Sequence, residues 1–163
     1  MRIVPLKKNW ILILFNWMFV KWGIFLDRDA IIRVSSIQNN DEEESIEIVS
    51  KGTFFKDNDE FVAKYDETEL SGLGDTSTTF RIGENYFSLI REGDTNTSMY
   101  FKNGKSNSIV YNTPHGGLSL RVKTNKVDID IDEKGGNVKV DYDIIIAREQ
   151  IINTKLVATI DVK

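Results

Sequence analysis

The chain has 163 residues, of which 40% are hydrophobic and 28% are charged, with a formal net charge of −4. This composition is typical of one globular domain with a buried core. With no cysteine and a single histidine, the sequence excludes disulfides, thiolate zinc sites, cysteine nucleophiles and two-histidine metal sites. The lack of cysteine also fits a reducing compartment, so we expect a cytoplasmic protein.

The charge is unevenly distributed along the chain. Residues 1–26 contain four basic side chains and no acid, which leaves a net charge of −8 on the rest. An acidic domain repels phosphate backbones, so we expect no nucleic-acid partner. Residues 10–26, WILILFNWMFVKWGIFL, are almost entirely apolar and contain all three tryptophans.

This apolar leader has three interpretations. As a membrane anchor it is marginal, because its 17 residues are interrupted by Asn16 and Lys21, whereas a spanning helix needs about 20 predominantly apolar residues. No small-residue cleavage site follows it, which argues against a secretory signal. A second interpretation is a start set too early, because the codons of Trp22 and Gly23 give a G-rich tract shortly before Leu26. The third is an added strand or helix.

We therefore divide the chain into a leader, residues 1–26, and one domain, residues 27–163. A start near Leu26 would make the leader foreign to the natural protein. Membrane association through residues 10–26 is expected only if the leader is genuine.

From residue 29 onward, apolar and polar side chains alternate with a period of two, which is typical of strands with one buried face. The clearest example is residues 117–146, where Leu118, Leu120 and Val122 share one parity and charged residues occupy the other. Short segments with glycine or asparagine, such as KNGK at 102–105 and EKGGN at 133–137, predict turns between strands. We read TN at 124–125 as one of these turns.

This pattern predicts an all-β fold without a long helix. The expected strands are 29–38, 44–56, 60–68, 77–83, 86–91, 97–102, 107–113, 117–124, 126–132, 137–147 and 152–161. So many short antiparallel strands leave exposed edges unless the sheet closes. An antiparallel up-and-down β-barrel is therefore the expected architecture, with a two-sheet β-sandwich as the alternative.

No residue pattern in the chain points to catalysis or to a metal. His115 lies in TPHG, where proline, histidine and glycine suit consecutive turn positions, and no nucleophile or orienting acid is near it in sequence. The stretch DIDIDEKGG at 128–136 resembles a calcium loop but has Glu133 where that loop requires glycine. We predict no catalytic residue, no metal site and no cofactor.

The barrel interior is the remaining candidate site. Large side chains with polar tips occur on successive strands, and a small barrel either fills itself with them or encloses one small ligand. Arg91, at the end of YFSLIR, is the polar residue most expected to face inward, toward a polar or anionic group. The predicted lining residues are Tyr65, Arg91, Met99 and Tyr111.

Several motifs in fixed order carry a resemblance to a known family. They are FVAKYDETELSGLGDTSTTFRI, FSLIREG, TSMYFKNGK, VYNTPHGGLSLRVKT and GGNVKVDYDI. Together they resemble the bacterial YwiB-like family, a domain of unknown function with a calycin-like, that is lipocalin-like, β-barrel. The family pattern begins near residue 27, so the leader lies outside it, which supports a start near Leu26. The family often has tyrosine at position 115, so the resemblance argues against a reaction that depends on His115. It implies a barrel fold and an intracellular setting, and no enzyme activity.

The sequence supports three functional hypotheses. The first is a non-enzymatic β-barrel that binds a small amphipathic molecule, as calycin barrels often do. The second is a structural or protein-interaction module with a filled barrel, which could form a homodimer through an exposed strand. The third is an enzyme that uses two carboxylates at the barrel mouth. An empty interior of ligand size would favour the first over the second.

Overall fold

The computed structural model describes residues 27–39, 43–113, 116–146 and 150–163. The leader (1–26) and His115, as well as the side chain of Tyr111, lie outside this description. No helix in the described residues is long and apolar enough to cross a lipid bilayer.

The described residues form ten antiparallel strands and one short 3₁₀ helix. In chain order these are β1 (Arg28–Asn39), β2 (Glu43–Asp57), β3 (Glu60–Asp66), η1 (Glu69–Ser71), β4 (Thr76–Ile82), β5 (Phe87–Gly93), β6 (Thr97–Phe101), β7 (Ser106–Thr113), β8 (Gly116–Asp132), β9 (Gly135–Ile146) and β10 (Gln150–Val162). The predicted turns at 102–105 and 133–137 each fall at a junction between consecutive strands.

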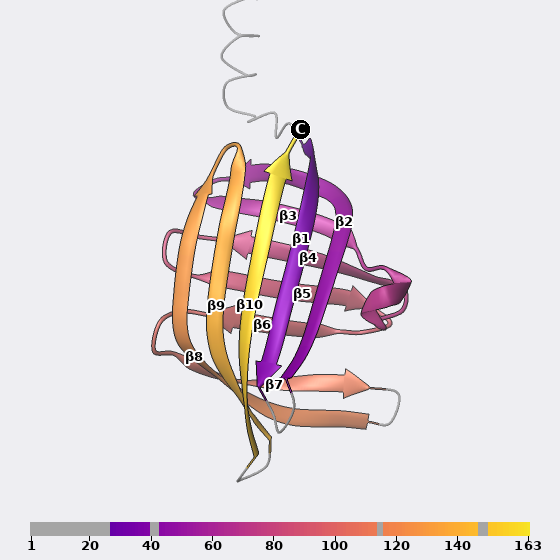
Figure 1. The fold of residues 1–163 in the computed structure, drawn as a ribbon, viewed down its shortest axis with the longest axis vertical. Helices are drawn as coiled ribbons and strands as arrows, with labels where there is room; N and C mark the ends of the chain where they lie inside the picture. The colour runs from indigo at the N-terminus through magenta and orange to yellow at the C-terminus, as the bar shows by residue number, and fades with distance from the viewer. Residues whose placement is uncertain (1–26, 40–42, 114–115, 147–149) are drawn as a thin grey trace, which may run out of the picture.

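The ten strands belong to one sheet in the order β6-β5-β4-β3-β2-β1-β10-β9-β8-β7. Each strand pairs with its neighbour in sequence except across β6 and β7, and β1 pairs with β10. The sheet therefore curls into a nearly closed up-and-down barrel, in which the front strands run steeply across the strands behind them (Figure 1). The predicted barrel is confirmed, and the two-sheet alternative is not observed.

Strand β8 is longer than predicted. The sequence pattern led us to expect two strands, 117–124 and 126–132, joined by a turn, but residues 116–132 form a single strand. It pairs with β9 from Leu120 to Asp132, with a register shift between Thr124 and Lys126. The shift is a β-bulge, which inserts one residue and reverses the parity of the side chains that follow. Both features that suggested a turn, the polar pair and the change of parity, arise from this bulge.

The bulge contacts the connection between β6 and β7. The backbone N–H of Thr124 donates a hydrogen bond to the carbonyl of Lys105 (2.8 Å), and the carbonyl of Thr124 accepts a hydrogen bond from the backbone N–H of Gly104 (3.2 Å). The Asn103 side chain accepts from the backbone N–H of Val127 (2.6 Å). Asn107 on β7 also donates to the carbonyl of Tyr100 on β6. These bonds hold the two edge strands near each other where no regular ladder joins them.

The tight turn between β8 and β9 depends on glycine. Gly135 has a φ of 99°, and a Cβ atom at this position would lie 2.0 Å from the carbonyl oxygen of Ile160 on β10. The predicted turn at EKGGN therefore serves two purposes: it allows a positive backbone angle, and it lets two strands approach closely.

Aromatic rings fill a large part of the barrel interior. The Phe80 and Phe87 ring centroids are 5.2 Å apart, and those of Phe87 and Phe101 are 5.9 Å apart. These side chains and that of Phe54 are completely buried. Phe54 lies opposite Arg28 in the pairing of β1 and β2, so the filled region includes the end of the barrel where β1 begins.

Candidate ligand-binding site

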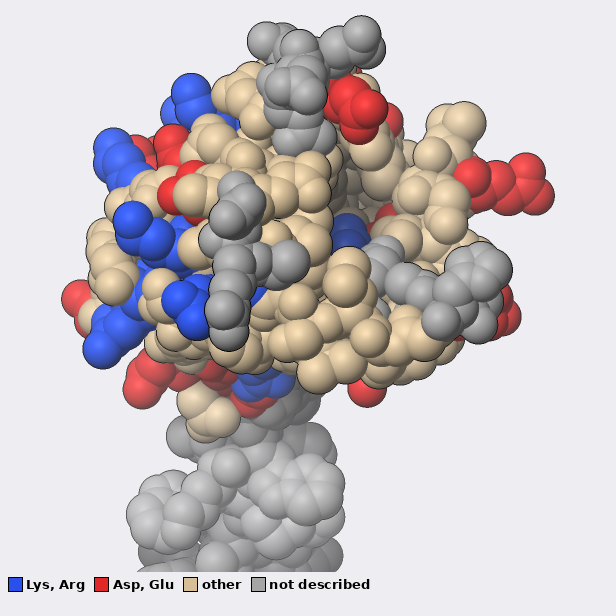
Figure 2. All heavy atoms as spheres, turned by 90° about the horizontal axis from the view of Figure 1, so that it is seen from below, with Lys and Arg blue, Asp and Glu red and all other residues tan. Residues whose placement is uncertain are grey.

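The other end of the barrel contains a cavity of about 410 Å³. Its wall is built from β1, β2, β5, β6, β8, β9, β10 and the connection between β3 and β4. The wall is mainly apolar, and its buried apolar side chains are Val34, Ile48, Leu89, Met99, Leu120 and Leu156. Figure 2, which views the molecule from this end, shows a hollow bordered mainly by uncharged side chains, with a basic side chain inside it.

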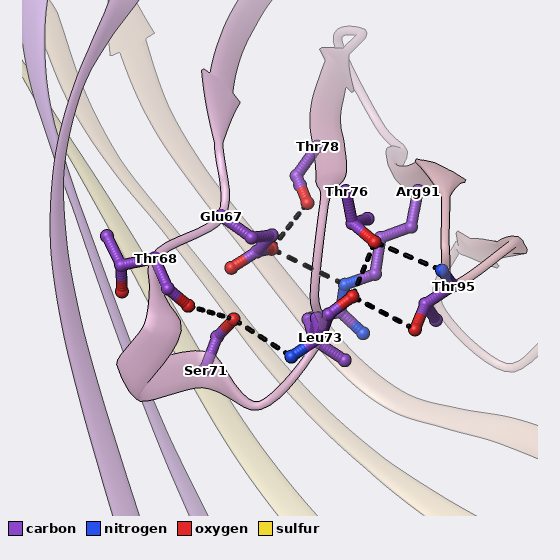
Figure 3. A network of polar contacts seen from close by, with 8 residues as sticks. All are labelled: Glu67, Thr68, Ser71, Leu73, Thr76, Thr78, Arg91 and Thr95. Carbon is purple, nitrogen blue, oxygen red and sulfur yellow. Dashed lines mark hydrogen bonds and ion pairs between the residues drawn. The ribbon is translucent and has the colours of Figure 1, made fainter.

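Arg91 is the charged residue among the described side chains that line the cavity. It lies on β5, and its Nε atom is 3.6 Å from Oε1 of Glu67, which follows β3. The Arg91 side chain is 19% exposed and that of Glu67 is 0% exposed. Thr78 on β4 donates its hydroxyl to the same Glu67 oxygen, so the carboxylate is fixed on the side of the guanidinium (Figure 3).

The pairing of the strands explains why these side chains meet. Tyr65 is opposite Thr78 in the pairing of β3 and β4, and Thr78 is opposite Arg91 in the pairing of β4 and β5. Side chains directly opposite in adjacent antiparallel strands lie on the same face of the sheet. Glu67 is two residues beyond Tyr65, and alternation directs it to the same inner face.

The connection between β3 and β4 supplies another part of the wall, through Ser71 and Leu73. Ser71 donates its hydroxyl to the carbonyl of Thr68 (2.8 Å) and accepts from the backbone N–H of Leu73 (3.3 Å). The Leu73 carbonyl accepts from the Thr76 hydroxyl (2.6 Å), and this hydroxyl accepts in turn from the N–H of Thr95 (3.0 Å). The network fixes this part of the cavity to β4 and to the β5–β6 connection (Figure 3).

Two buried tyrosines flank the ion pair. Burial raises the pKa of Tyr65 well above its usual value; the negative charge of Glu67 acts in the same direction, and Arg91 opposes it. Burial also raises the pKa of Tyr142, again against the positive charge of Arg91. Both phenols are therefore neutral at physiological pH. Tyr142 lines the cavity, with its ring centroid 4.8 Å from that of Phe101.

The structure brings two of the four predicted lining residues into the cavity wall, namely Arg91 and Met99. Tyr65 is 4% exposed and packs edge-on against Phe80, with ring centroids 5.5 Å apart, and it is not among the residues that line the cavity. The backbone of Tyr111 lies on β7, opposite Leu118. That these residues bind a ligand stays a prediction.

Sequence reasoning missed Glu67. The sequence did contain an indication that the Glu67 side chain faces inward, because Glu67 has the same parity as the buried Ala63 and Tyr65 near the end of β3. An acid at an inward position is unusual unless a cation is paired with it. This reasoning would have predicted a partner for Arg91.

Comparison with known proteins places this barrel in a family. Residues 31–157 match the model of the domain of unknown function DUF1934. The chain belongs to the DUF1934 family. The chain is also similar to the uncharacterized beta-barrel protein YwiB of Bacillus subtilis (strain 168), with 27% identity over 117 residues, covering 71% of this chain and 80% of the relative.

The fold of this DUF1934 domain also matches a solved structure. The crystal structure of the ywiB protein from Bacillus subtilis superposes with a TM-score of 0.75 at 22% sequence identity, covering 84% of this chain and 93% of the other. At this level of identity the likeness establishes the fold. Together with the family match, it confirms the YwiB-like resemblance identified from the motifs.

Proposed function

We propose that this protein binds one small amphipathic molecule in the cavity at the open end of the barrel, without converting it chemically. The observation that carries the proposal is the cavity itself. Its volume of about 410 Å³ lies in the range of small-molecule sites, roughly 300 to 1,000 Å³. A filled barrel would offer no such space.

The chemistry of the wall supports an amphipathic ligand. Aliphatic side chains from several strands would surround the apolar part of a ligand, and Arg91 would provide hydrogen-bond donors for its polar head group. Arginine keeps its proton under all ordinary conditions and cannot act as a general base, so it suits recognition better than proton transfer. Binding in a calycin-like barrel of a cytoplasmic protein is consistent with this arrangement and with the absence of cysteine.

Native mass spectrometry of the full chain, purified gently from its source cell, tests the proposal. We expect a stoichiometric additional mass that is released by denaturation. Ser36 lines the cavity on β1, so Ser36→Phe should fill it and abolish the additional mass. Ser35→Phe places the same ring on the opposite face of the same strand and should retain it. A ligand-free wild-type protein, or a ligand kept by Ser36→Phe, would reject the proposal.

A protein-interaction role is the second candidate. It is favoured by exposed apolar side chains, including Ile46, Leu118 and Ile151, which are 54%, 45% and 63% exposed. Ile46 and Leu118 line the cavity, so a partner there would cover its mouth. Analytical ultracentrifugation of the ligand-free full chain tests this role: a concentration-dependent dimer that Leu118→Lys disrupts would support it, and a monomer at all concentrations would oppose self-association.

A further inference from the structure

The Arg91–Glu67 pair also constrains the charge of the ligand. We infer that the cavity selects amphipathic molecules with an uncharged, hydrogen-bond-accepting head group, such as an amide, ester or alcohol, over those with a carboxylate. This inference rests on the proposed function and specifies its ligand class.

The first step concerns the charge already present in the wall. Arg91 could serve as the counter-ion of an acidic ligand only if its own charge were unpaired. Instead Glu67 lies 3.6 Å from it, with a side chain that is 0% exposed. The Thr78 hydroxyl fixes the same carboxylate oxygen, so Glu67 is held as the counter-ion within the protein. The charges of Arg91 and Glu67, the ion pair in the described part of this site, therefore sum to zero.

The second step concerns the cost of adding a charge. A carboxylate ligand would place a second anion close to a buried one in a largely apolar enclosure. One guanidinium would then be shared between two carboxylates, and one negative charge would be left without compensation. An uncharged acceptor avoids this cost, because it gains a charge-assisted hydrogen bond and adds no net charge.

The third step concerns the donors that remain for a ligand. A guanidinium has five N–H donors, and the 3.6 Å contact with Glu67 joins its Oε1 to Nε of Arg91. The Arg91 side chain lines the cavity and is still 19% exposed. The pair with Glu67 therefore leaves donors of this guanidinium for an uncharged head group in the cavity.

Competition binding to the full chain tests this inference. Decanamide and decanoate have the same shape and differ in charge, and each can displace the uncharged dye N-phenylnaphthylamine. We expect wild-type protein to prefer decanamide by about tenfold or more. Glu67→Gln leaves the charge of Arg91 unbalanced and should shift the ratio toward decanoate by about tenfold or more.

Glu92→Gln provides the matched control, since Glu92 is exposed and lies next to Arg91 in sequence, where side chains alternate between faces. It should leave the preference at the wild-type ratio. If Glu67→Gln does not fold, the neutral double variant R91Q/E67Q replaces it and should bind decanamide about tenfold more weakly than wild type, still in preference to decanoate.

The outcomes separate the two proposals. Equal or tighter binding of decanoate by wild-type protein, or a ratio unchanged in Glu67→Gln, would overturn the inference about charge and leave ligand binding intact. Failure of the dye and both decyl compounds to bind, or equal binding by Ser36→Phe, would overturn the proposed function itself.

Discussion

At the scale of single residues, the ion pair between Arg91 and Glu67 is expected to contribute strongly to stability. Arg91→Met would leave the Glu67 carboxylate fully buried without its counter-ion, which typically costs about 3 to 5 kcal/mol. Urea unfolding should show this loss. The double variant R91M/E67Q removes both charges and should recover most of it. A single variant as stable as wild type would show that the pair does not hold this end of the barrel together.

Tyr65 gives a pH-dependent prediction at the same scale. The pKa of Tyr65 is raised above the ordinary value of 10.0 in the folded protein, so the unfolded chain releases this proton first as the pH rises. The contribution of the neutral phenol to stability is therefore complete below pH 10 and declines above it, by up to about 1.4 kcal/mol per pH unit. Unfolding free energies measured from pH 8 to 11 should fall less steeply in Tyr65→Phe. Parallel curves for the two proteins would contradict this assignment.

At the scale of elements, the bulge in β8 determines which side chains face the interior. Val122 before the bulge and Val127 after it are both buried. Their numbers differ by five, so in a regular strand they would face opposite sides of the sheet. Deleting Asn125 would remove the extra residue and give a regular strand in which Val122, Thr124 and Val127 share the inward parity, so we expect a fold that is still cooperative by circular dichroism and urea unfolding. Asn125→Ala keeps the length and loses the 3.1 Å hydrogen bond to Asp141, at a cost of about 0.5 to 1.5 kcal/mol. A deletion variant that no longer folds cooperatively would contradict this and show that the barrel depends on the contacts of the bulge with the β6–β7 connection.

The same element shows what the sequence can and cannot predict. The period of two and the turn residues predicted the strands and the barrel, because both reflect local chemistry. A change of parity has two local causes, a turn or a bulge, and only the pairing of β8 with β9 distinguishes them. The inward direction of Arg91 was predictable from its parity. The cavity was not, because its volume depends on how strands that are distant in sequence curve around each other.

At the scale of the whole molecule, the barrel is divided into a packed end and an open end. Phe80 is completely buried among other rings, and Phe80→Ala should cost about 3 to 5 kcal/mol. Leu118 at the cavity mouth is 45% exposed, and Leu118→Ala should cost less than about 1 kcal/mol. Urea unfolding of both variants tests this division. Similar losses at the two sites would mean that stability is shared evenly along the barrel.

The pairing of β1 with β10 has a mechanical consequence. Ala30 lies opposite Val162, so the first and last strands are antiparallel neighbours. The beginning of β1 and the end of β10 lie side by side at the packed end of the barrel (Figure 1). A force that pulls these two ends apart would act across the strands and load their hydrogen bonds one after another, rather than all together along the strand direction. In a single-molecule pulling experiment the barrel should therefore open at low force between β1 and β10, starting far from the cavity.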